Sequence, residues 1–400
     1  MRFAKRVDHL TGKGAEAWAL HGLGVKQQRE TGEEVLFLTV GEPDFDTPLF
    51  IQEASTASMT AGNTHYSAVE GSQELREAIA AWHETTTGQS VTADQIVVAA
   101  GAQCALFCAI QCLAGPGDEV ITSDPRYSTY EAVIGASGAD LVSVPLLPDR
   151  NFALDLEALR AAVTPRTRAI LLNTPHNPTG AVLSEAELRA VADLCKEKDI
   201  WLVSDEVYGA LTYDRPHRSP AALPGMAERT AVVSSISKSH AMTGWRVGWV
   251  VGPEELAQHL YNLVLCMLYG GPGFIQDAAT VALKEGHAEV ARMHEAYHRR
   301  RDLMAPWLDR LPNLSCASPE GGMFVMLDVR ETGLSATDFA LGLLREESVA
   351  MLPGDGFGTQ AEGFCRLSLG FSDALLTEAC KRIEAYATRL AEQGPSASVA

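Results

Sequence analysis

Short apolar, β-branched runs alternate with segments of helical periodicity through the middle of the chain. Seven such runs lie between residues 95 and 252: QIVVAA, EVITS, DLVSVPL, RAILLN, IWLVSDE, AVVSSIS and VGWVVG. Between several of them lie amphipathic patterns such as LSEAELRAVADLCKEKD at residues 183–199, which predict helices. Strands that lack a polar face and are separated by helices are typical of a parallel sheet covered on both sides. The pattern therefore predicts an α/β fold of the doubly wound kind, with a large domain built on a mostly parallel, seven-stranded sheet.

The pattern changes in the last third of the chain. A long charged helix is predicted from about residue 274 to 311, then the strands GMFVMLDV, SVAML and FCRLSLG, then an amphipathic helix from about residue 373 to 391. Helices and strands that are segregated in this way indicate a smaller α+β domain, which we expect N-terminal residues to complete. The predicted division is 1–45 for the N-terminal contribution to the small domain, 46–285 for the large domain and 286–400 for the C-terminal small domain.

Composition narrows the function classes. The chain has 400 residues and a formal net charge of -19, which argues against a nucleic-acid binder because phosphate binding needs a basic surface. The N-terminal segment MRFAKRVDHLTGKG has no apolar core, so we expect no export signal. Scattered cysteines are typical of a reducing compartment, and Cys104, Cys108 and Cys112 are predicted to share one helix face. We therefore expect a cytoplasmic protein.

Two patterns suggest other classes of protein and are rejected. The apolar stretch that begins at Ile96 is long enough to suggest a membrane-spanning helix. However, Gly101, Gln103 and Gln111 interrupt it, and a buried strand followed by a helix explains the pattern better. The sequence HEAYH at residues 294–298 matches a zinc-protease motif. Three arginines follow it directly and the helix has polar residues around its circumference, so a solvated surface helix is expected and no metal site is predicted.

Several polar residues follow the predicted strands at their carboxyl ends. Gly101 in AAGAQCAL can open a helix N-terminus that binds phosphate, although an ordinary strand-to-helix turn also explains it. Asn177 lies in the turn NTPHNPTG, where it could also satisfy its own backbone. Asp205 ends an apolar strand in WLVSDEVYG, and a buried carboxylate needs a cation. Tyr208 and Lys238 complete the set, which matches the phosphate, ring nitrogen and aldehyde of pyridoxal 5′-phosphate (PLP).

Six motifs in order resemble the class I/II aminotransferases, which are PLP enzymes of fold type I, over nearly the whole chain. The motifs are GEPDFDTP, THYSAVEGSQELREAI, NTPHNPTG, SDEVYG, SISKSHAMTGWRVGW and CRLSLG. The resemblance implies that Lys238 forms the Schiff base with PLP and shuttles protons, and that Asp205 pairs with the pyridinium nitrogen. It also implies that Asn177 and Tyr208 hydrogen-bond the ring 3-oxygen.

The remaining roles are also implied by the resemblance. The phosphate would be held by Ala102, Gln103, Ser235 and Arg246, with Tyr66 reaching across from a second subunit of a homodimer. Tyr127 would stack on the ring. Arg366 would bind the substrate α-carboxylate through two parallel hydrogen bonds, which lysine cannot copy, and Gly41 and Asn177 would complete the substrate site.

Three segments narrow the substrate further: AGAQCALF, SKSHAMTGWRVGWVVGP and LVLCMLYGGPGFIQDAA resemble bacterial arginine:pyruvate transaminases. The implied reaction is ping-pong transfer of an α-amino group from L-arginine, or a related guanidino amino acid, to a 2-oxo acid such as pyruvate. Glu42, Asp44 and Glu70 are unranked candidates to accept the guanidinium. The alternatives are an aspartate, aromatic or broad-specificity aminotransferase, a PLP-dependent β-C–S lyase, and a ligand-sensing domain of a transcription regulator.

Overall fold

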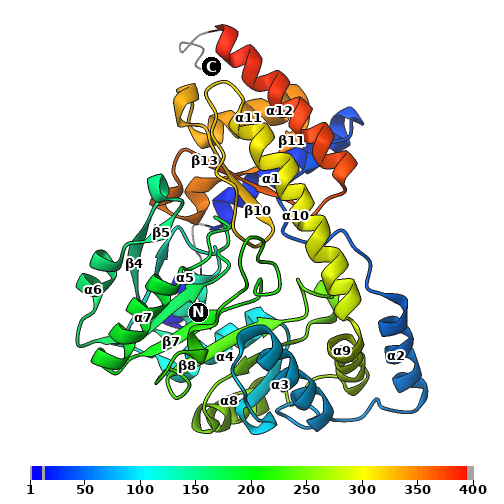
Figure 1. The fold of residues 1–400 in the computed structure, drawn as a ribbon, viewed down its shortest axis with the longest axis vertical. Coiled ribbons are helices and arrows are strands. Elements are labelled where there is room, and N and C mark those ends of the chain that lie inside the picture. The colour runs from blue at the N-terminus through cyan, green and yellow to red at the C-terminus, as the bar shows by residue number, and fades with distance from the viewer. Residues whose placement is uncertain (1, 11–13, 394–400) are drawn as a thin grey trace.

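The computed structural model describes residues 2–10 and 14–393. An eight-stranded sheet forms its centre, with strand order β2-β9-β8-β7-β6-β3-β4-β5 (Figure 1). The strands are β2 (Ile96–Ala99), β3 (Glu119–Asp124), β4 (Asp140–Leu147), β5 (Ala153–Leu154), β6 (Thr167–Asn173), β7 (Trp201–Asp205), β8 (Thr230–Ser235) and β9 (Gly248–Val251).

The predicted mostly parallel sheet is confirmed, with one additional strand. All seven apolar runs form strands, and the pairs β4-β3, β3-β6, β6-β7 and β7-β8 are parallel. Strand β9 is antiparallel to both of its neighbours. The strand that was not predicted, β5, has two residues paired antiparallel to the end of β4. A strand this short shows no periodicity in the sequence.

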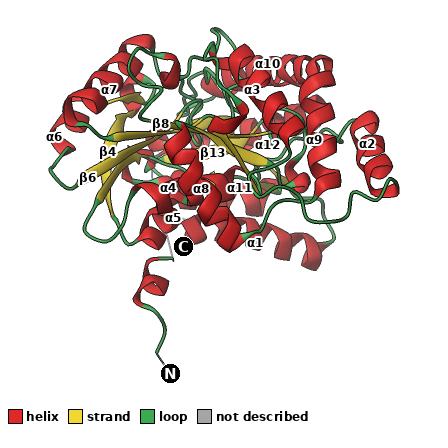
Figure 2. Ribbon diagram, turned by 90° about the horizontal axis from the view of Figure 1, so that it is seen from below, coloured by secondary structure: helices red, strands yellow, loops and turns green. Residues whose placement is uncertain are grey.

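Helices cover both faces of this sheet, which Figure 2 shows edge-on. One face packs against α4 (Ala102–Leu113), α5 (Tyr130–Ser137) and α8 (Glu254–Met267). The other face packs against α3 (Gln73–Thr87), α6 (Leu156–Ala162), α7 (Glu185–Lys198) and α9 (Gly273–Glu285), with α2 (Leu49–Thr60) beside α9. Ser184 caps α7, and its side chain and that of Glu187 hydrogen-bond each other's backbone N–H groups. Within the described residues, no helix combines the length and apolar content that a bilayer span requires.

The C-terminal elements form a second packing unit that the N-terminal segment joins. A three-stranded sheet has the order β10-β13-β12, and a parallel pair links β1 with β11. These elements and the surrounding helices are α1 (Gly14–Thr31), β1 (Leu36–Phe37), β10 (Phe324–Asp328), α11 (Ala336–Glu347), β11 (Val349–Ala350), β12 (Leu352–Pro353), β13 (Phe364–Ser368) and α12 (Asp373–Gln393).

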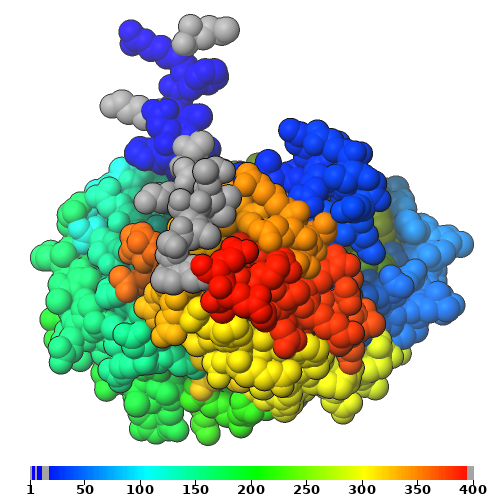
Figure 3. Space-filling view, turned by 90° about the horizontal axis from the view of Figure 1, so that it is seen from above, coloured from blue at the N-terminus to red at the C-terminus, as the bar shows by residue number. Residues whose placement is uncertain are grey.

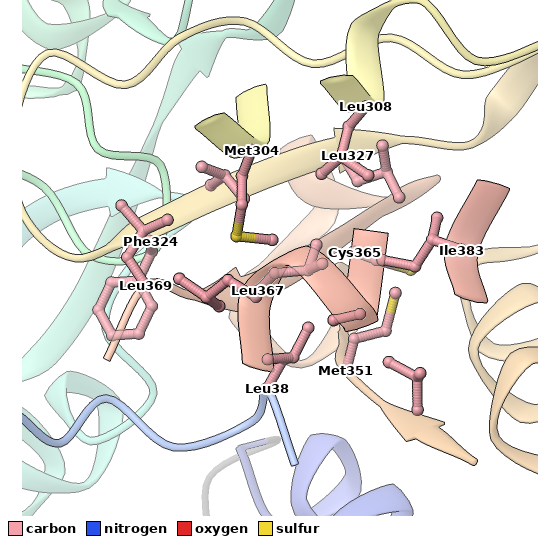
Figure 4. Packing of buried hydrophobic residues seen from close by; sticks show 14 of the residues in the cluster. Leu38, Met304, Leu308, Phe324, Leu327, Met351, Cys365, Leu367, Leu369 and Ile383 are labelled. Carbon is pink, nitrogen blue, oxygen red and sulfur yellow. The ribbon is translucent and has the colours of Figure 1, made fainter. Parts of the chain in front are cut away.

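The contact between the two ends of the chain is built from buried side chains. Leu38, which follows β1, packs in one cluster with Met351, Leu367 and Ile383 of the C-terminal elements (Figure 4). Figure 3 shows α1, in blue, beside the orange C-terminal segments. Residues from the two ends of the sequence therefore share one core, as expected. The domain boundaries at residues 45 and 285 stay a prediction.

The helix expected from residue 274 to 311 is two helices, α9 and α10 (His287–Asp309), which are separated at Gly286. The expectation that the region around HEAYH is a solvated surface helix was wrong. Arg300 and Arg301 of α10 are buried, since Asp44, Asp214 and Asp373 neutralise them. Burial of paired arginines cannot be read from a polar pattern, because their partners are distant in sequence. No group of three or more His, Cys, Asp or Glu side chains that could hold a metal ion occurs among the described residues.

The remaining elements are short. They are the 3-10 helices η1 (Lys5–His9), η2 (Ala93–Gln95), η3 (Pro148–Arg150), η4 (Pro220–Ala222), η5 (Thr243–Trp245), η6 (Arg330–Thr332), η7 (Gly354–Phe357) and η8 (Thr359–Ala361). The η5 turn matters for function because it directly precedes Arg246.

Candidate active site

A cavity of about 290 Å³ lies at the carboxyl edge of the central sheet. Asn173, Asp205 and Ser235 are the last residues of three neighbouring parallel strands, β6, β7 and β8, and all three line it. Ligands bind outside the carboxyl ends of the strands in open α/β sheets. The cavity brings together eleven of the twelve predicted site residues: Gly41, Ala102, Gln103, Tyr127, Asn177, Asp205, Tyr208, Ser235, Lys238, Arg246 and Arg366.

Lys238 extends into the cavity from the loop after β8. Its Nζ donates a hydrogen bond to the backbone oxygen of Gly41 at 2.5 Å. Burial lowers the pKa of the Lys238 amine to about 8; Glu42 opposes this, and the positive charges of Arg366 and Arg246 add to it. A neutral amine, which is the nucleophilic form, is therefore accessible near neutral pH.

Asp205 is buried and lines the same cavity as that amine. Its Oδ2 accepts a hydrogen bond from the Tyr130 hydroxyl at 2.7 Å, and its Oδ1 accepts one from the Val207 N–H at 3.3 Å. Burial raises the pKa of the Asp205 carboxyl to about 6, although these two hydrogen bonds lower it. Among the described residues no cationic side chain pairs with Asp205. The carboxylate thus has room for a positively charged ligand group.

The N-terminus of α4 and Arg246 form an anion site. Gly101 has φ +85°, and a Cβ there would lie 2.5 Å from Arg246 Nη2. A Cβ at Gly248 would collide with the backbone N of Ala102. Two glycines therefore let the β9 backbone and the Arg246 guanidinium approach the free N–H groups at the start of this twelve-residue helix. Ser235 is buried beside them and lines the same cavity.

Asn177 and Tyr208 line the cavity together with Asp205 and Arg366. The Asn177 N–H donates to Asn173 Oδ1 at 2.7 Å, which fixes the turn after β6, and its side-chain oxygen accepts from Arg366. Tyr208 is buried, and burial raises the pKa of its phenol, so it stays a hydrogen-bond donor. The Tyr127 ring meets the Tyr130 ring edge-on at 5.6 Å between centroids.

Arg366 is a buried cation that lacks an anionic partner among the described residues. Nη1 donates to Asn177 Oδ1 at 2.9 Å and Nη2 to the Thr39 oxygen at 2.7 Å, while Nε has no partner in the described chain. The guanidinium lies against the rings of Phe324 and Phe357, at 4.1 and 4.7 Å from their centroids. A buried guanidinium without a carboxylate is costly, so the site favours an anionic ligand.

Tyr66 is the one predicted residue that the cavity does not include. Its side chain is 87% exposed, and its ring lies 4.9 Å from that of Tyr269. Tyr66 was expected to serve a second subunit, and its position in this chain leaves that expectation a prediction.

Residues that were not predicted from the sequence include Phe324 and Trp18, which line the cavity, and Tyr130, which hydrogen-bonds Asp205. Tyr130 follows Tyr127 by three residues in SDPRYSTY and begins α5, so its spacing was a usable signal. Phe324 could not be distinguished in the sequence from the other apolar residues of the strand GMFVMLDV, so it was not predicted as a site residue. Trp18 of α1 also lines the cavity, and its distance along the chain from the other site residues gave no signal.

These features fit PLP. The anion site matches a phosphate, Asp205 matches a protonated ring nitrogen, Lys238 matches an aldehyde, and Arg366 matches the carboxylate of an amino acid. Each of the four groups faces the same cavity, and two of them, Asp205 and Arg366, lack a charged partner among the described residues.

Comparison with known proteins gives the family. Residues 33–383 match the profile described as "Aminotransferase class I and II". The chain belongs to the class I and II aminotransferases. It is 53% identical to the arginine–pyruvate transaminase AruH of Pseudomonas aeruginosa, over 98% of this chain and 100% of that one. It is 38% identical to an aspartate aminotransferase of Musicola paradisiaca over 88% of each chain.

The aminotransferase fold is confirmed by solved structures. A Thermus thermophilus aspartate aminotransferase mutant superposes with a TM-score of 0.91 and 36% identity, over 96% of this chain and 100% of that chain. The protein is therefore an aminotransferase that uses PLP, and its fold is that of the fold type I enzymes.

Proposed function

We propose that this aminotransferase transfers the α-amino group of L-arginine, or of a related guanidino amino acid, to a 2-oxo acid such as pyruvate. The observation that carries the proposal is its 53% identity, end to end, to an arginine–pyruvate transaminase. The relatives named aspartate aminotransferases are more distant, at 38% identity or less.

The cofactor would be held at four points by residues of this chain. Ala102, Gln103, Ser235 and Arg246 would hold the phosphate, and Asp205 the ring nitrogen. Asn177 and Tyr208 would donate hydrogen bonds to the ring 3-oxygen, and Tyr127 would stack on the ring. When bound, PLP supplies an aldehyde that takes up the amino group and a ring that accepts electrons from the substrate Cα.

Lys238 has two proposed tasks. Its amine would hold the aldehyde carbon in the resting enzyme and then, once displaced by the substrate amine, take the proton from the substrate Cα. The lowered pKa, near 8, keeps part of the Nζ population neutral at neutral pH, so it can accept that proton. The same Nζ would return a proton to the Cα of the second substrate.

Arg366 is proposed to bind the α-carboxylate of both substrates. Its Nε is unpaired among the described residues, and Asn177 and Thr39 fix the other guanidinium nitrogens. Two parallel hydrogen bonds to a carboxylate would orient Cα toward Lys238. Gly41 and Asn177 would complete this substrate site, because both line the cavity beside Lys238 and Arg366.

The candidate guanidinium acceptors can now be ranked. Asp44 is occupied by a bidentate pair with Arg300 at 2.7 and 2.8 Å. Glu70 lies 3.7 Å from Arg76. Glu42 accepts a single hydrogen bond from Thr243 at 2.6 Å, and Thr243 lines the active-site cavity. Glu42 is therefore the least occupied of the three carboxylates, but it does not line the cavity itself and would act only from its edge.

Steady-state kinetics with a panel of amino donors tests the proposal. We expect kcat/KM for arginine with pyruvate to exceed those for aspartate, glutamate and phenylalanine by at least about tenfold, since side-chain discrimination of this size needs only about 1.4 kcal/mol. A preference for aspartate or an aromatic donor would support the alternative specificity. Pyruvate release from cystathionine without an oxo-acid acceptor would instead identify a β-C–S lyase.

Assembly and location are proposed on separate grounds. We infer a homodimer with shared active sites, because Tyr66 and Tyr269 form an exposed aromatic pair, with Met267 also exposed. We also place the enzyme in the cytoplasm, since all eight cysteines of the chain lie within the described residues and are free.

A further inference from the structure

A guanidino substrate meets an electrostatic problem in this cavity. The cavity lining carries three basic side chains, Lys238, Arg246 and Arg366, but a single acidic one, Asp205. Asp205 is buried and already accepts hydrogen bonds from Tyr130 and Val207. The lining of the described chain therefore offers no free carboxylate to a second positive charge.

An aromatic face can bind a cation without carrying a charge. Guanidinium groups stack on indole rings more favourably than on other aromatic rings. Trp18 of α1 supplies the one indole that lines the cavity within the described residues. Trp18 is 41% exposed, and its one aromatic contact within the described part of the chain is an edge contact with His21, at 5.7 Å and 73°.

Trp18 is also held in place beside the substrate site. His21, one helical turn further along α1, bonds Thr39 Oγ1 at 2.7 Å, and the Thr39 backbone oxygen accepts a hydrogen bond from Arg366. Val40 and Gly41, which follow, line the cavity together with Trp18. Thr39 therefore anchors the Arg366 guanidinium through its backbone oxygen and anchors α1, the helix that carries the Trp18 indole, through His21.

We infer that the exposed indole of Trp18 is the surface on which the guanidinium of the amino donor stacks, so Trp18 is a specificity-determining residue. This inference rests on the proposed arginine specificity. Arg366 binds the α-carboxylate and Trp18 receives the far end of the same substrate. A long cationic side chain is then favoured over a short or anionic one.

Binding of two unreactive analogues tests the inference without turnover. Both 5-guanidinopentanoate and 5-ureidopentanoate lack the amino group, and they differ in charge but hardly in shape. We expect wild-type holoenzyme to bind the guanidino compound about tenfold more tightly in calorimetry. Trp18→Phe should keep part of this ratio, and Trp18→Leu should reduce it to about twofold or less.

A matched control separates this effect from general loss of a tryptophan. Trp307 lies on α10 outside the cavity and donates to Glu384 at 3.0 Å, so Trp307→Leu should keep the wild-type ratio. The ratio of arginine to citrulline in kcat/KM should follow the binding ratio across all four proteins. This dependence on charge distinguishes recognition by Trp18 from a structural role of the same residue.

Failure of the inference and failure of the proposed function have different signatures. If wild-type enzyme prefers arginine over citrulline and Trp18→Leu keeps that preference, the stacking inference is overturned and the proposed function stands. If wild-type enzyme shows no preference for the guanidino compounds in binding or turnover, both are overturned.

Discussion

Lys238 and Asp205 show opposite pKa displacements with one cause. Burial disfavours the charged form of each group, so the pKa of Lys238 falls to about 8 and that of Asp205 rises to about 6. Both residues were predicted from the sequence as site residues, since Asp205 ends an apolar strand and Lys238 lies shortly after another. Trp18 was not predicted, because only the folded chain brings it to the cavity, whereas Tyr130, which donates to Asp205, was missed although its spacing from Tyr127 was a usable signal.

Glu42→Gln should make Lys238 easier to deprotonate. The Glu42 charge raises the pKa of Lys238, so its removal should move that pKa further below about 8. The neutral amine then persists to lower pH. The rate of PLP uptake by apoprotein should rise through a midpoint at lower pH than in wild type, and should increase roughly twofold at pH 7. An unchanged midpoint, equal to that of the surface control Glu84→Gln, would contradict the assignment.

Asp205→Asn should stabilise the apoprotein and impair the enzyme. The pKa of Asp205 is raised on folding, so the native state binds more protons and apoprotein stability falls as pH rises from about 4 to 6. The asparagine variant should lose this dependence and unfold at higher urea concentration at pH 8, by about 1–3 kcal/mol. Its kcat should nevertheless fall at least about 100-fold, since the ring nitrogen loses its anionic partner.

An apoprotein of Asp205→Asn that is less stable than wild type at pH 8 would contradict the burial argument. Full activity of the same variant would contradict the proposed role of the carboxylate. The two measurements are independent, so each claim can fail alone.

At the scale of elements, the apolar pattern predicted secondary structure well where it reports burial of a strand on both faces or of a helix on one face. The seven long strands and α7 follow their patterns closely, and Ser184 begins α7 as its capping position predicts. Helix α10 did not follow, because its polar residues are buried by ion pairs with distant segments. Pattern alone cannot distinguish a solvated arginine from one paired across the fold.

Asp44→Asn should destabilise the protein through α10. Arg300 is 4% exposed at its side chain and is paired by Asp44 through both terminal nitrogens. Loss of the Asp44 charge leaves Asp373 as the carboxylate that pairs with this buried cation, which should lower the free energy of unfolding by about 2 kcal/mol. Urea denaturation should show this loss, whereas Arg299→Ala at a 60% exposed side chain should change stability by less than about 1 kcal/mol. Equal effects of the two substitutions would contradict the argument.

At the scale of the whole molecule, the order of elements along the chain predicted the architecture. The predicted order, an α/β sheet followed by α+β elements, also predicted the position of the cavity, because the carboxyl ends of parallel strands lie at one edge of the sheet. The convergence of the N-terminal segment with the C-terminal core was expected, but its detailed pairing of β1 with β11 was not readable from two-residue strands.

The proposed homodimer predicts a role for Tyr66 across subunits. Sedimentation should give a mass about twice the chain mass of 42.9 kDa. Tyr66→Phe removes a hydroxyl that is exposed in the single chain, so it should weaken PLP binding about tenfold without changing that mass. A monomeric mass, or unaltered PLP affinity in this variant, would contradict the shared site.

The absorbance spectrum of the purified protein tests the central claim most directly. With PLP bound through Lys238, the wild-type protein should show a visible absorbance band, which arginine should remove and pyruvate should restore. Lys238→Ala should not show this cycle. Wild-type protein that develops no such band with PLP, or a Lys238→Ala variant that responds to arginine and pyruvate as wild type does, would contradict the account.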